Sequence, residues 1–270
     1  MKTRITLFFA AVLLSSCKSP IYYQVYKTES ASVKPVAQDR ISYEDNDCRI
    51  DYNLWKDRGN AGFTFYNKTN EVIHVHLEES FYVLNGHAYD YYQNRIYSDG
   101  SNVITKVTRG MGVSGIGASG LGWMTMYSNS TVSNAQHSVS VVENAIISIP
   151  PKTSKTITEF DINQTLYRDC DLWLYPSRRQ VKGKTFTATT SPLQFYNRIS
   201  YTAGTATQRT TVNNDFYVSE ITNYPESELF KNADKAFCGQ KDYSAAKTFK
   251  DSAPNWFYLR YNSDSDYWKH

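Results

Sequence analysis

The sequence has little of several features that would assign it to a class at once. Its longest apolar stretch, Ile5–Leu14, contains Thr6 and ends after ten residues, too few to cross a bilayer as a helix. The mean hydropathy of −0.53 excludes a polytopic membrane protein. Four cysteines in 270 residues are too few for a fold built on disulfides. The net charge is only +3 and 41% of the residues are hydrophobic, a balance that excludes a disordered chain.

Motifs of nucleotide and hydrolytic chemistry are also scarce. The pattern G-x-G-x-x-G occurs at Gly110–Gly115 and Gly115–Gly120, but a dinucleotide fingerprint needs a following helix, and a Ser/Asn/Thr tract follows here. No G-x-S-x-G motif is present. No pair of carboxylates can be assigned to glycoside hydrolysis, because spacing in sequence does not fix their separation. We therefore expect no cofactor and no enzymatic activity.

Charge is missing from one long segment. Gly110–Val142 contains no Asp, Glu, Lys or Arg over 33 residues, in a chain that is 20% charged. We interpret residues 109–137 as an uncharged Gly/Ser-rich loop or projecting hairpin, since long loops without structure are uncommon unless they are functional or disordered. A segment that touches a membrane or self-associates is the alternative.

The N-terminus carries the most specific pattern. Residues 1–16 combine a basic start (Lys2, Arg4), an apolar stretch and small residues, which is typical of an export signal. Leu14-Ser15-Ser16-Cys17 resembles the lipobox of bacterial lipoproteins, which implies acylation of Cys17 and a membrane anchor that does not cross the bilayer. An ordinary secretory signal is the alternative. Removal of residues 1–16 leaves 29 − 2 = 27 basic and 26 acidic residues, and without a sustained basic run we expect no nucleic-acid partner.

The remaining chain reads as mostly β. Residues 17–40 predict a lipidated tether with at most one short strand, residues 41–262 a folded body, and residues 263–270 a tail. Short alternating runs between turn signals, with Asn85-Gly86 as a tight turn, predict an immunoglobulin-like β-sandwich with long loops and one or two short helices near the C-terminus. The best helix candidate is Pro225–Phe237. The expected strands lie at 49–55, 62–66, 72–83, 138–149, 155–162, 171–175, 184–190, 195–202, 215–221 and 256–261.

Several motifs together resemble a family of uncharacterised lipoproteins from gut Bacteroidetes. They are Gly62–Thr69, Glu78–Phe81, Asn85-Gly86, Ile149–Lys155 and Leu166–Cys170. The resemblance covers most of the mature chain and supplies no catalytic residues. It implies a Gram-negative envelope, and Lys18 after the cysteine fits sorting to the outer membrane, with periplasmic face or cell surface left open.

Two kinds of modification follow from the compartment. Cys48, Cys170 and Cys238 remain after lipidation, and an oxidising compartment allows one disulfide among them, with three pairings open. Asp251-Ser252-Ala253 resembles the O-glycosylation sequon of the same phylum, which implies a glycan on Ser252.

One short strand offers metal-ligating residue types. Alternation along a strand places His74, His76 and Glu78 on one face, opposite Ile73 and Val75. Two histidines and a carboxylate can ligate zinc. The simpler interpretation is the solvated face of a half-buried strand, so we predict no metal.

Aromatic residues are in excess at 15% of the chain, with 22 tyrosines. Most fit strand packing, but two clusters could form an exposed binding patch: Tyr89, Tyr91, Tyr92, Trp256 and Tyr258. We predict a lipid-anchored envelope protein with a non-catalytic role, accessory to an outer-membrane assembly. A glycan-binding module using the aromatic clusters is the alternative, and a metal-dependent hydrolase is a third.

Overall fold

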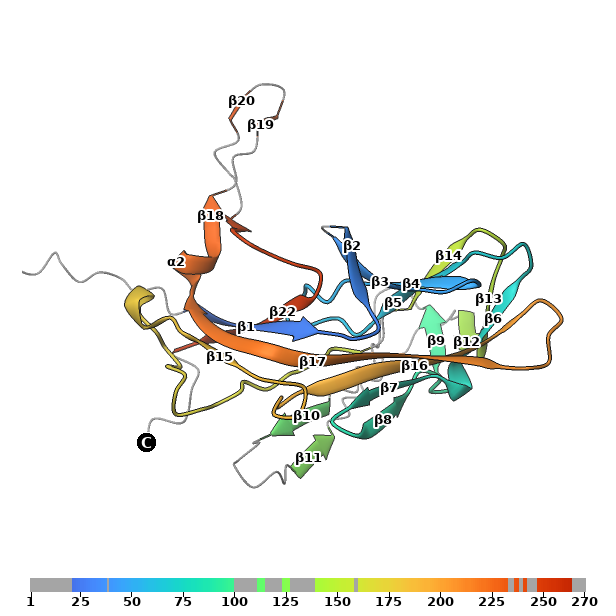
Figure 1. Cartoon of the computed structure of the whole chain (residues 1–270), viewed down its shortest axis with the longest axis horizontal. Helices are drawn as coiled ribbons and strands as arrows, with labels where there is room; N and C mark the ends of the chain where they lie inside the picture. Colours follow the sequence, from blue (N-terminus) through green and yellow to red (C-terminus); the bar gives the residue numbers. More distant parts are fainter. Residues whose placement is uncertain are drawn as a thin grey trace, which may run out of the picture.

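The chain forms an antiparallel β-sandwich in the computed structural model (Figure 1), which confirms the predicted fold class. The structure describes residues 21–37, 39–99, 111–114, 123–126, 139–157, 160–232, 236–237, 240–241 and 247–263. No helix in these ranges is long and apolar enough to cross a membrane.

The first sheet has nine strands, with β13-β6-β16-β17-β1-β22 as its main path. Off this path, β7 pairs with β16, β8 with β7 and β15 with β17. The second has the order β14-β5-β4-β3-β2. The strands of the first sheet are β1 (Ile21–Glu29), β6 (Ile73–His76), β7 (Phe81–Leu84), β8 (His87–Asp90), β13 (Ile146–Ile149), β15 (Gly183–Thr185), β16 (Gln194–Ala203), β17 (Thr210–Pro225) and β22 (Trp256–Asn262). Those of the second are β2 (Lys34–Ala37), β3 (Arg40–Glu44), β4 (Cys48–Tyr52), β5 (Phe63–Asn67) and β14 (Ser154–Ile157).

The core lies between the two sheets. Residues alternate between buried and half-buried along β4 and β5, as expected of strands with one face on a core. Aromatic rings of opposite sheets meet in edge-to-face contacts, at 5.3 Å between the centroids of Tyr52 and Phe216 and 5.4 Å between those of Phe65 and Tyr201. Burying each such side chain contributes about 1.5–3 kcal/mol, so the aromatic excess serves mainly to pack the sandwich.

The predicted tether is wrong over most of its length. Ile21–Glu29 form β1, which pairs with β17 on one side and β22 on the other. Five consecutive residues of β1 are buried, because a strand inside the sheet is covered on both faces and loses the alternation that marks a half-buried strand. The first described strand therefore begins at residue 21, four residues after Cys17.

The predicted tight turn at Asn85-Gly86 is confirmed, whereas the predictions for residues 72–83 and 225–237 differ locally from the structure. Asn85 and Gly86 have φ values of 47° and 82° and close a two-residue hairpin between β7 and β8, as this dipeptide favours. The run 72–83 is divided by a 3-10 turn, η2 (Leu77–Glu79). The predicted helix over 225–237 shrinks to one turn, α2 (Glu226–Leu229), because Phe230 instead pairs with Phe249 in the hairpin of β18 (Phe230–Asn232) and β21 (Lys247–Phe249).

The predicted strand over 171–175 is absent, because side chains satisfy its backbone without a ladder. Asn223 Nδ2 donates to the carbonyl of Trp173 at 2.9 Å, and the Tyr261 hydroxyl donates to that of Leu174 at 2.5 Å. The 3-10 turn η3 (Arg178–Gln180) follows this segment.

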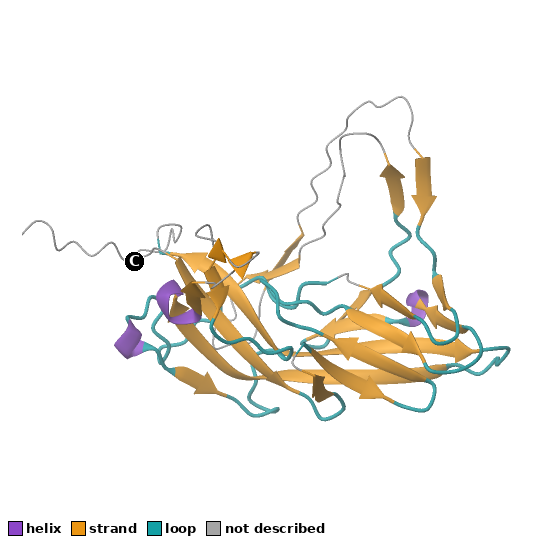
Figure 2. Cartoon of the chain, turned by 90° about the horizontal axis from the view of Figure 1, so that it is seen from above, coloured by secondary structure: helices purple, strands orange, loops and turns teal. Residues whose placement is uncertain are grey.

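A two-stranded ladder of β9 (Ile96–Asp99) and β12 (Val139–Val142) stands out from the body (Figure 2). Glu143 fixes its base: the carboxylate accepts hydrogen bonds from the backbone N–H groups of Gln93 and Arg95, both at 3.0 Å, and pairs with the Arg95 guanidinium. Burial alone would raise the pKa of the Glu143 carboxyl, but these hydrogen bonds outweigh it and lower the pKa.

Part of the uncharged segment is also in strands. Beyond the ladder, β10 (Met111–Ser114) pairs with β11 (Trp123–Met126), in line with the hairpin alternative for residues 109–137. Short hairpin strands β19 (Ala236–Phe237) and β20 (Gln240–Lys241) lie between β18 and β21 in sequence. The rest of residues 109–137 lies outside the described part.

One edge of the sandwich has no charge or proline in its strand. The outer strands of the two sheets generally carry such residues, which discourage pairing with other chains: Lys34 and Pro35 in β2, Asp90 in β8, Lys155 in β14, Lys184 in β15 and Arg260 in β22. The exception is β13, with Ile146, Ile147, Ser148 and Ile149, which pairs with β6 alone. Ile146 is 44% exposed.

Candidate functional site

The first predicted aromatic cluster belongs largely to the core. Tyr91 is completely buried, and its hydroxyl donates to Asn197 Oδ1 at 2.7 Å. Tyr89 is half-buried and stacks on Tyr82 at 6.1 Å between ring centroids. Tyr92 is half-buried and packs against the core, and its hydroxyl donates to Asn94 Oδ1. The prediction that Tyr91 belongs to an exposed patch is therefore wrong.

The second predicted cluster packs against a smaller apolar cluster on the outer face of β1 and β22. Tyr258 is half-buried and lies 5.7 Å from Tyr23 and 5.0 Å from Trp55 between ring centroids. Trp256 is half-buried with Lys27 Nζ 4.9 Å above its ring. Both side chains have structural partners, so neither offers an open aromatic face to a ligand.

The three candidate metal-ligating residues do not form one group: His76 Nδ1 lies 3.9 Å from Glu78 Oε1, but His74 faces Ser148. His74 Nδ1 lies 3.0 Å from Ser148 Oγ, and His76 Nε2 lies 3.2 Å from Thr202 Oγ1. Glu78 lies on η2 rather than on β6, so strand alternation does not apply to it. Burial lowers the pKa of His76. Within the described ranges, no three His, Cys, Asp or Glu side chains are grouped so that they could hold a metal ion.

The cysteines and the predicted modification sites are scattered. Cys48 is buried and Cys170 is exposed, and they do not pair with each other; burial also raises the pKa of the Cys48 thiol. Ser252 is exposed in the loop before β22. Cys17 and Cys238 lie outside the described residues.

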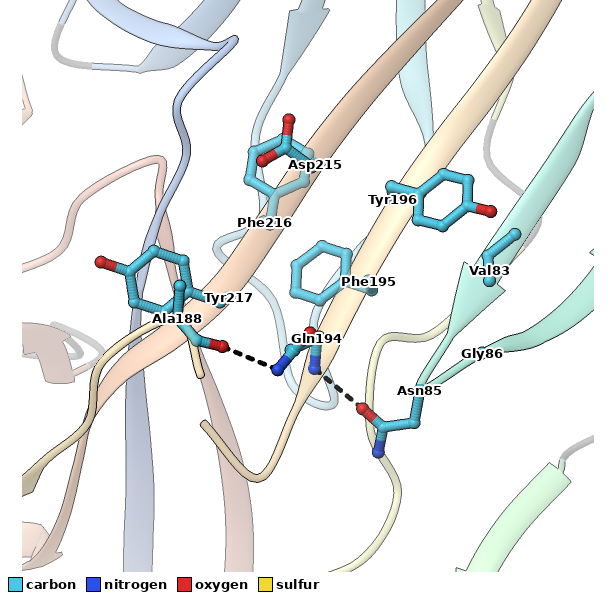
Figure 3. Close-up of a pocket in the computed structure, with 10 residues that line it drawn as sticks. All are labelled: Val83, Asn85, Gly86, Ala188, Gln194, Phe195, Tyr196, Asp215, Phe216 and Tyr217. Atoms are coloured by element: carbon cyan, nitrogen blue, oxygen red, sulfur yellow. Dashed lines mark hydrogen bonds between the residues drawn. The ribbon is translucent and has the colours of Figure 1, made fainter. Parts of the chain in front are cut away.

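An open groove of about 560 Å³ lies on the outer face of the first sheet, over β7, β16 and β17 (Figure 3). Strand register builds it as two rows of side chains. Val83, Tyr196 and Asp215 are neighbours across the three strands in one row. In the next row, Gln194 lies opposite Tyr217, and Asn85 follows at the end of β7. The two tyrosines are therefore diagonal neighbours, a spacing of about 7 Å in such sheets.

The groove is held in shape from both sides of the sheet. Phe195 and Phe216 point into the core, where their rings stack at 5.1 Å. On the outer face, Asn85 Oδ1 accepts from the Gln194 backbone N–H at 2.8 Å, and Gln194 Nε2 donates to the Ala188 carbonyl at 2.7 Å (Figure 3). This arrangement fixes the Gln194 side chain while leaving its Oε1 as an acceptor.

Residues of the β1 end complete the polar side of the groove. Ser32 Oγ donates to Asp215 Oδ1 at 2.9 Å. The Tyr217 hydroxyl donates to the Glu29 carboxylate, and this hydrogen bond raises the pKa of Tyr217. Tyr196 is 36% exposed. The groove thus combines aromatic rings with amide and carboxylate groups, the mixture that small-molecule sites use for contact area and orientation.

Sequence reasoning missed this groove although it predicted its strands. The expected runs 195–202 and 215–221 lie within β16 and β17, and alternation puts Tyr196 and Asp215 on the face opposite Phe195 and Phe216. The usable signal was a tyrosine on the polar face of a strand; the register that brings it to Tyr217 was not visible.

No protein-family model, no curated protein and no solved structure matches the chain. The geometry of the groove is therefore the main guide to function.

Proposed function

We propose that the protein is a lipid-anchored, non-catalytic binding protein of the outer membrane, and that its groove on β7, β16 and β17 binds an uncharged glycan. The observation that carries this proposal is the diagonal pair Tyr196 and Tyr217, flanked by the polar groups of Gln194 and Asp215. A cofactor has no part in the proposal.

The side chains suit the two faces of a sugar ring. A pyranose presents patches of C–H groups that pack on an aromatic ring, and hydroxyls that both donate and accept hydrogen bonds. Tyr196 and Tyr217 supply rigid rings with polar tips, Asp215 supplies acceptors, and the Gln194 amide can both donate and accept. Two aromatic side chains at diagonal positions on neighbouring strands offer contact to more than one sugar unit, which suits an extended glycan better than a single small molecule.

The charge of the groove favours a neutral ligand. Asp215 is the charged residue among those that line the groove. A second carboxylate, Glu29, accepts a hydrogen bond from the hydroxyl of Tyr217 at the edge of the groove. No cation is among the described residues that line the groove, so a ligand rich in carboxylates or phosphates would meet like charge at the lining. We therefore expect neutral glycans to bind in preference to acidic ones.

The anchoring part of the proposal rests on the sequence around Cys17. Because β1 begins at Ile21, the fourth residue after Cys17, a lipid on Cys17 would hold the body close to the bilayer surface. In cells fed a tagged fatty acid, wild type should be labelled. A Cys17→Ala variant should lose this acyl-chain incorporation. The expected accessory role in an outer-membrane assembly stays a prediction.

A glycan array tests the binding part. The full-length chain, purified in a mild detergent, should bind a set of neutral glycans, and Tyr196→Ala should lose that signal. Trp173→Ala is the matched control, because Trp173 is an aromatic residue 62% exposed outside the groove lining. An array without signal for wild type, or equal binding by wild type and Tyr196→Ala, would contradict the proposal.

A further inference from the structure

The start of β1 and the loop before η3 lie at one end of the sandwich, on the left in Figure 1. Tyr22, the second residue of β1, packs its ring against Tyr175 at 5.2 Å and against Tyr261 at 5.8 Å between centroids. The carbonyl of Trp173 is held by Asn223, the register partner of Gln24. The 173–175 loop is thus fixed against the first residues of β1.

This loop presents the most exposed aromatic side chain of those that the structure describes. Trp173 is 62% exposed although its backbone is tied to β17. Trp and Tyr side chains are enriched where protein meets the headgroup region of a bilayer, since the ring prefers the apolar side and the N–H or O–H the wet side.

Basic residues surround the same loop. Residues 168–184 contain five basic and two acidic residues. Lys184 pairs with both acids, Asp169 and Asp171, and the segment keeps an excess of positive charge. The basic residues are Arg168, Arg178, Arg179, Lys182 and Lys184. The side chain of Arg178 is 82% exposed and pairs with Glu228, and Arg179 and Lys182 are exposed. Such a cluster attracts anionic lipid headgroups.

The length of chain before β1 brings this end to the membrane. Ile21 is the fourth residue after Cys17, so the link reaches at most about 14 Å when fully extended. A lipid on Cys17 therefore leaves the Ile21 end of the sandwich no room to turn far from the bilayer. Charge, an exposed tryptophan and a short link occur together at this end.

We propose that the surface formed by Trp173, Tyr175, Arg179 and Lys182 docks on the lipid bilayer, with Trp173 at the headgroup level. The proposal rests on the anchoring of Cys17 and adds an orientation to it. The Glu29 end of β1 then points away from the membrane, about 26 Å from Ile21 at the rise of a β-strand. The groove, which adjoins Glu29 through Tyr217, is held clear of the lipid surface.

Fluorescence quenching tests the docking directly. The full-length lipidated chain is reconstituted into vesicles of phosphatidylethanolamine and phosphatidylglycerol, with a phospholipid brominated near the headgroup end of its acyl chains. Brominated lipid should quench part of the tryptophan emission of wild type, and Trp173→Phe should lose most of that quenched component. Trp256→Phe is the matched control and should keep it, because Trp256 lies opposite Lys27, six residues along β1 from Ile21.

Flotation of the same vesicles separates the two ways of failing. Quenching that is equal in wild type and Trp173→Phe, while both float with the vesicles, would overturn the docking and leave the anchor intact. A wild-type chain that does not float would overturn the anchor and the docking together. A double variant, Arg179→Glu with Lys182→Glu, should still float through the lipid but show at least a twofold drop in quenching.

Discussion

Tyr217 lies opposite Glu29 across β17 and β1, and its hydroxyl donates a hydrogen bond to the Glu29 carboxylate. The pair joins the candidate groove to the far end of the strand that begins beside the predicted anchor. In the proposed orientation, β1 therefore connects the membrane-docking end of the body to the groove.

Removing the Tyr217 hydroxyl should loosen the groove without harming the fold. In Tyr217→Phe, the ring stays and the hydrogen bond to Glu29 is lost, so we expect glycan affinity to fall about threefold to tenfold, the worth of a modest hydrogen bond. Titration calorimetry measures the affinity. Equal affinity of wild type and variant would mean that the hydroxyl does not shape the site.

Tyr91 should prove structural. Tyr91→Phe leaves Asn197 Oδ1 without its donor in the core, and an unsatisfied buried acceptor costs about 1–3 kcal/mol. Urea unfolding should show that loss, while glycan binding by the folded fraction stays as in wild type. A variant with unchanged stability and lost binding would return Tyr91 to the binding residues.

The Glu143 clamp should make stability depend on pH in the acid range. The pKa of this carboxyl is lowered in the folded state, so its contribution is present above the unfolded pKa of about 4.3 and is lost as pH falls through the lower folded value. We expect Glu143→Gln to unfold about 2 kcal/mol more easily than wild type near neutral pH, and the difference to shrink below a pH of about 4. A difference that stayed constant with pH would contradict the charged clamp.

The two described cysteines should differ in reactivity. Cys170 is exposed, whereas Cys48 is buried and its thiol pKa is raised, and only a thiolate reacts readily. A maleimide added to native protein should label Cys170 and reach Cys48 only after unfolding, as read by peptide mass spectrometry. Native labelling of Cys48 at the rate of Cys170 would contradict its burial.

The edge strand β13 should favour self-association at high concentration, since nothing in its sequence discourages pairing. Ile146→Lys places a charge there and should lower the weight-average mass seen by sedimentation of concentrated protein. Val36→Lys is the control: Val36 is 59% exposed, but its strand already contains Lys34 and Pro35. Equal effects of the two variants would remove any special role for β13.

The sequence pattern predicted the strands that have one solvent-exposed face. It did not predict the features that depend on residues distant in the sequence. Alternation identified the segments around Ile50 and Phe65, which lie between core and solvent. The strand from Ile21 was assigned to a tether because burial on both faces removes that alternation. The sequence places Tyr91 in an aromatic cluster that could be exposed, whereas packing against Phe63 and Phe160 buries it.

The groove could not be found from the sequence because its parts are far apart along the chain. Tyr217 and Glu29 are separated by 188 residues, and Ser32 and Asp215 by 183. Strand order and register bring these residues together, and neither can be predicted from local sequence patterns. The basic cluster of residues 168–184 became meaningful in the same way, once the structure placed its loop beside the start of β1.

A calorimetric titration of the strongest neutral glycan from the array, into the full-length chain and two variants, tests the central claim most directly. The groove account predicts that Tyr196→Ala weakens binding at least tenfold while Trp173→Ala binds like wild type. Wild-type affinity in Tyr196→Ala, or an equal loss in both variants, would contradict binding at this groove.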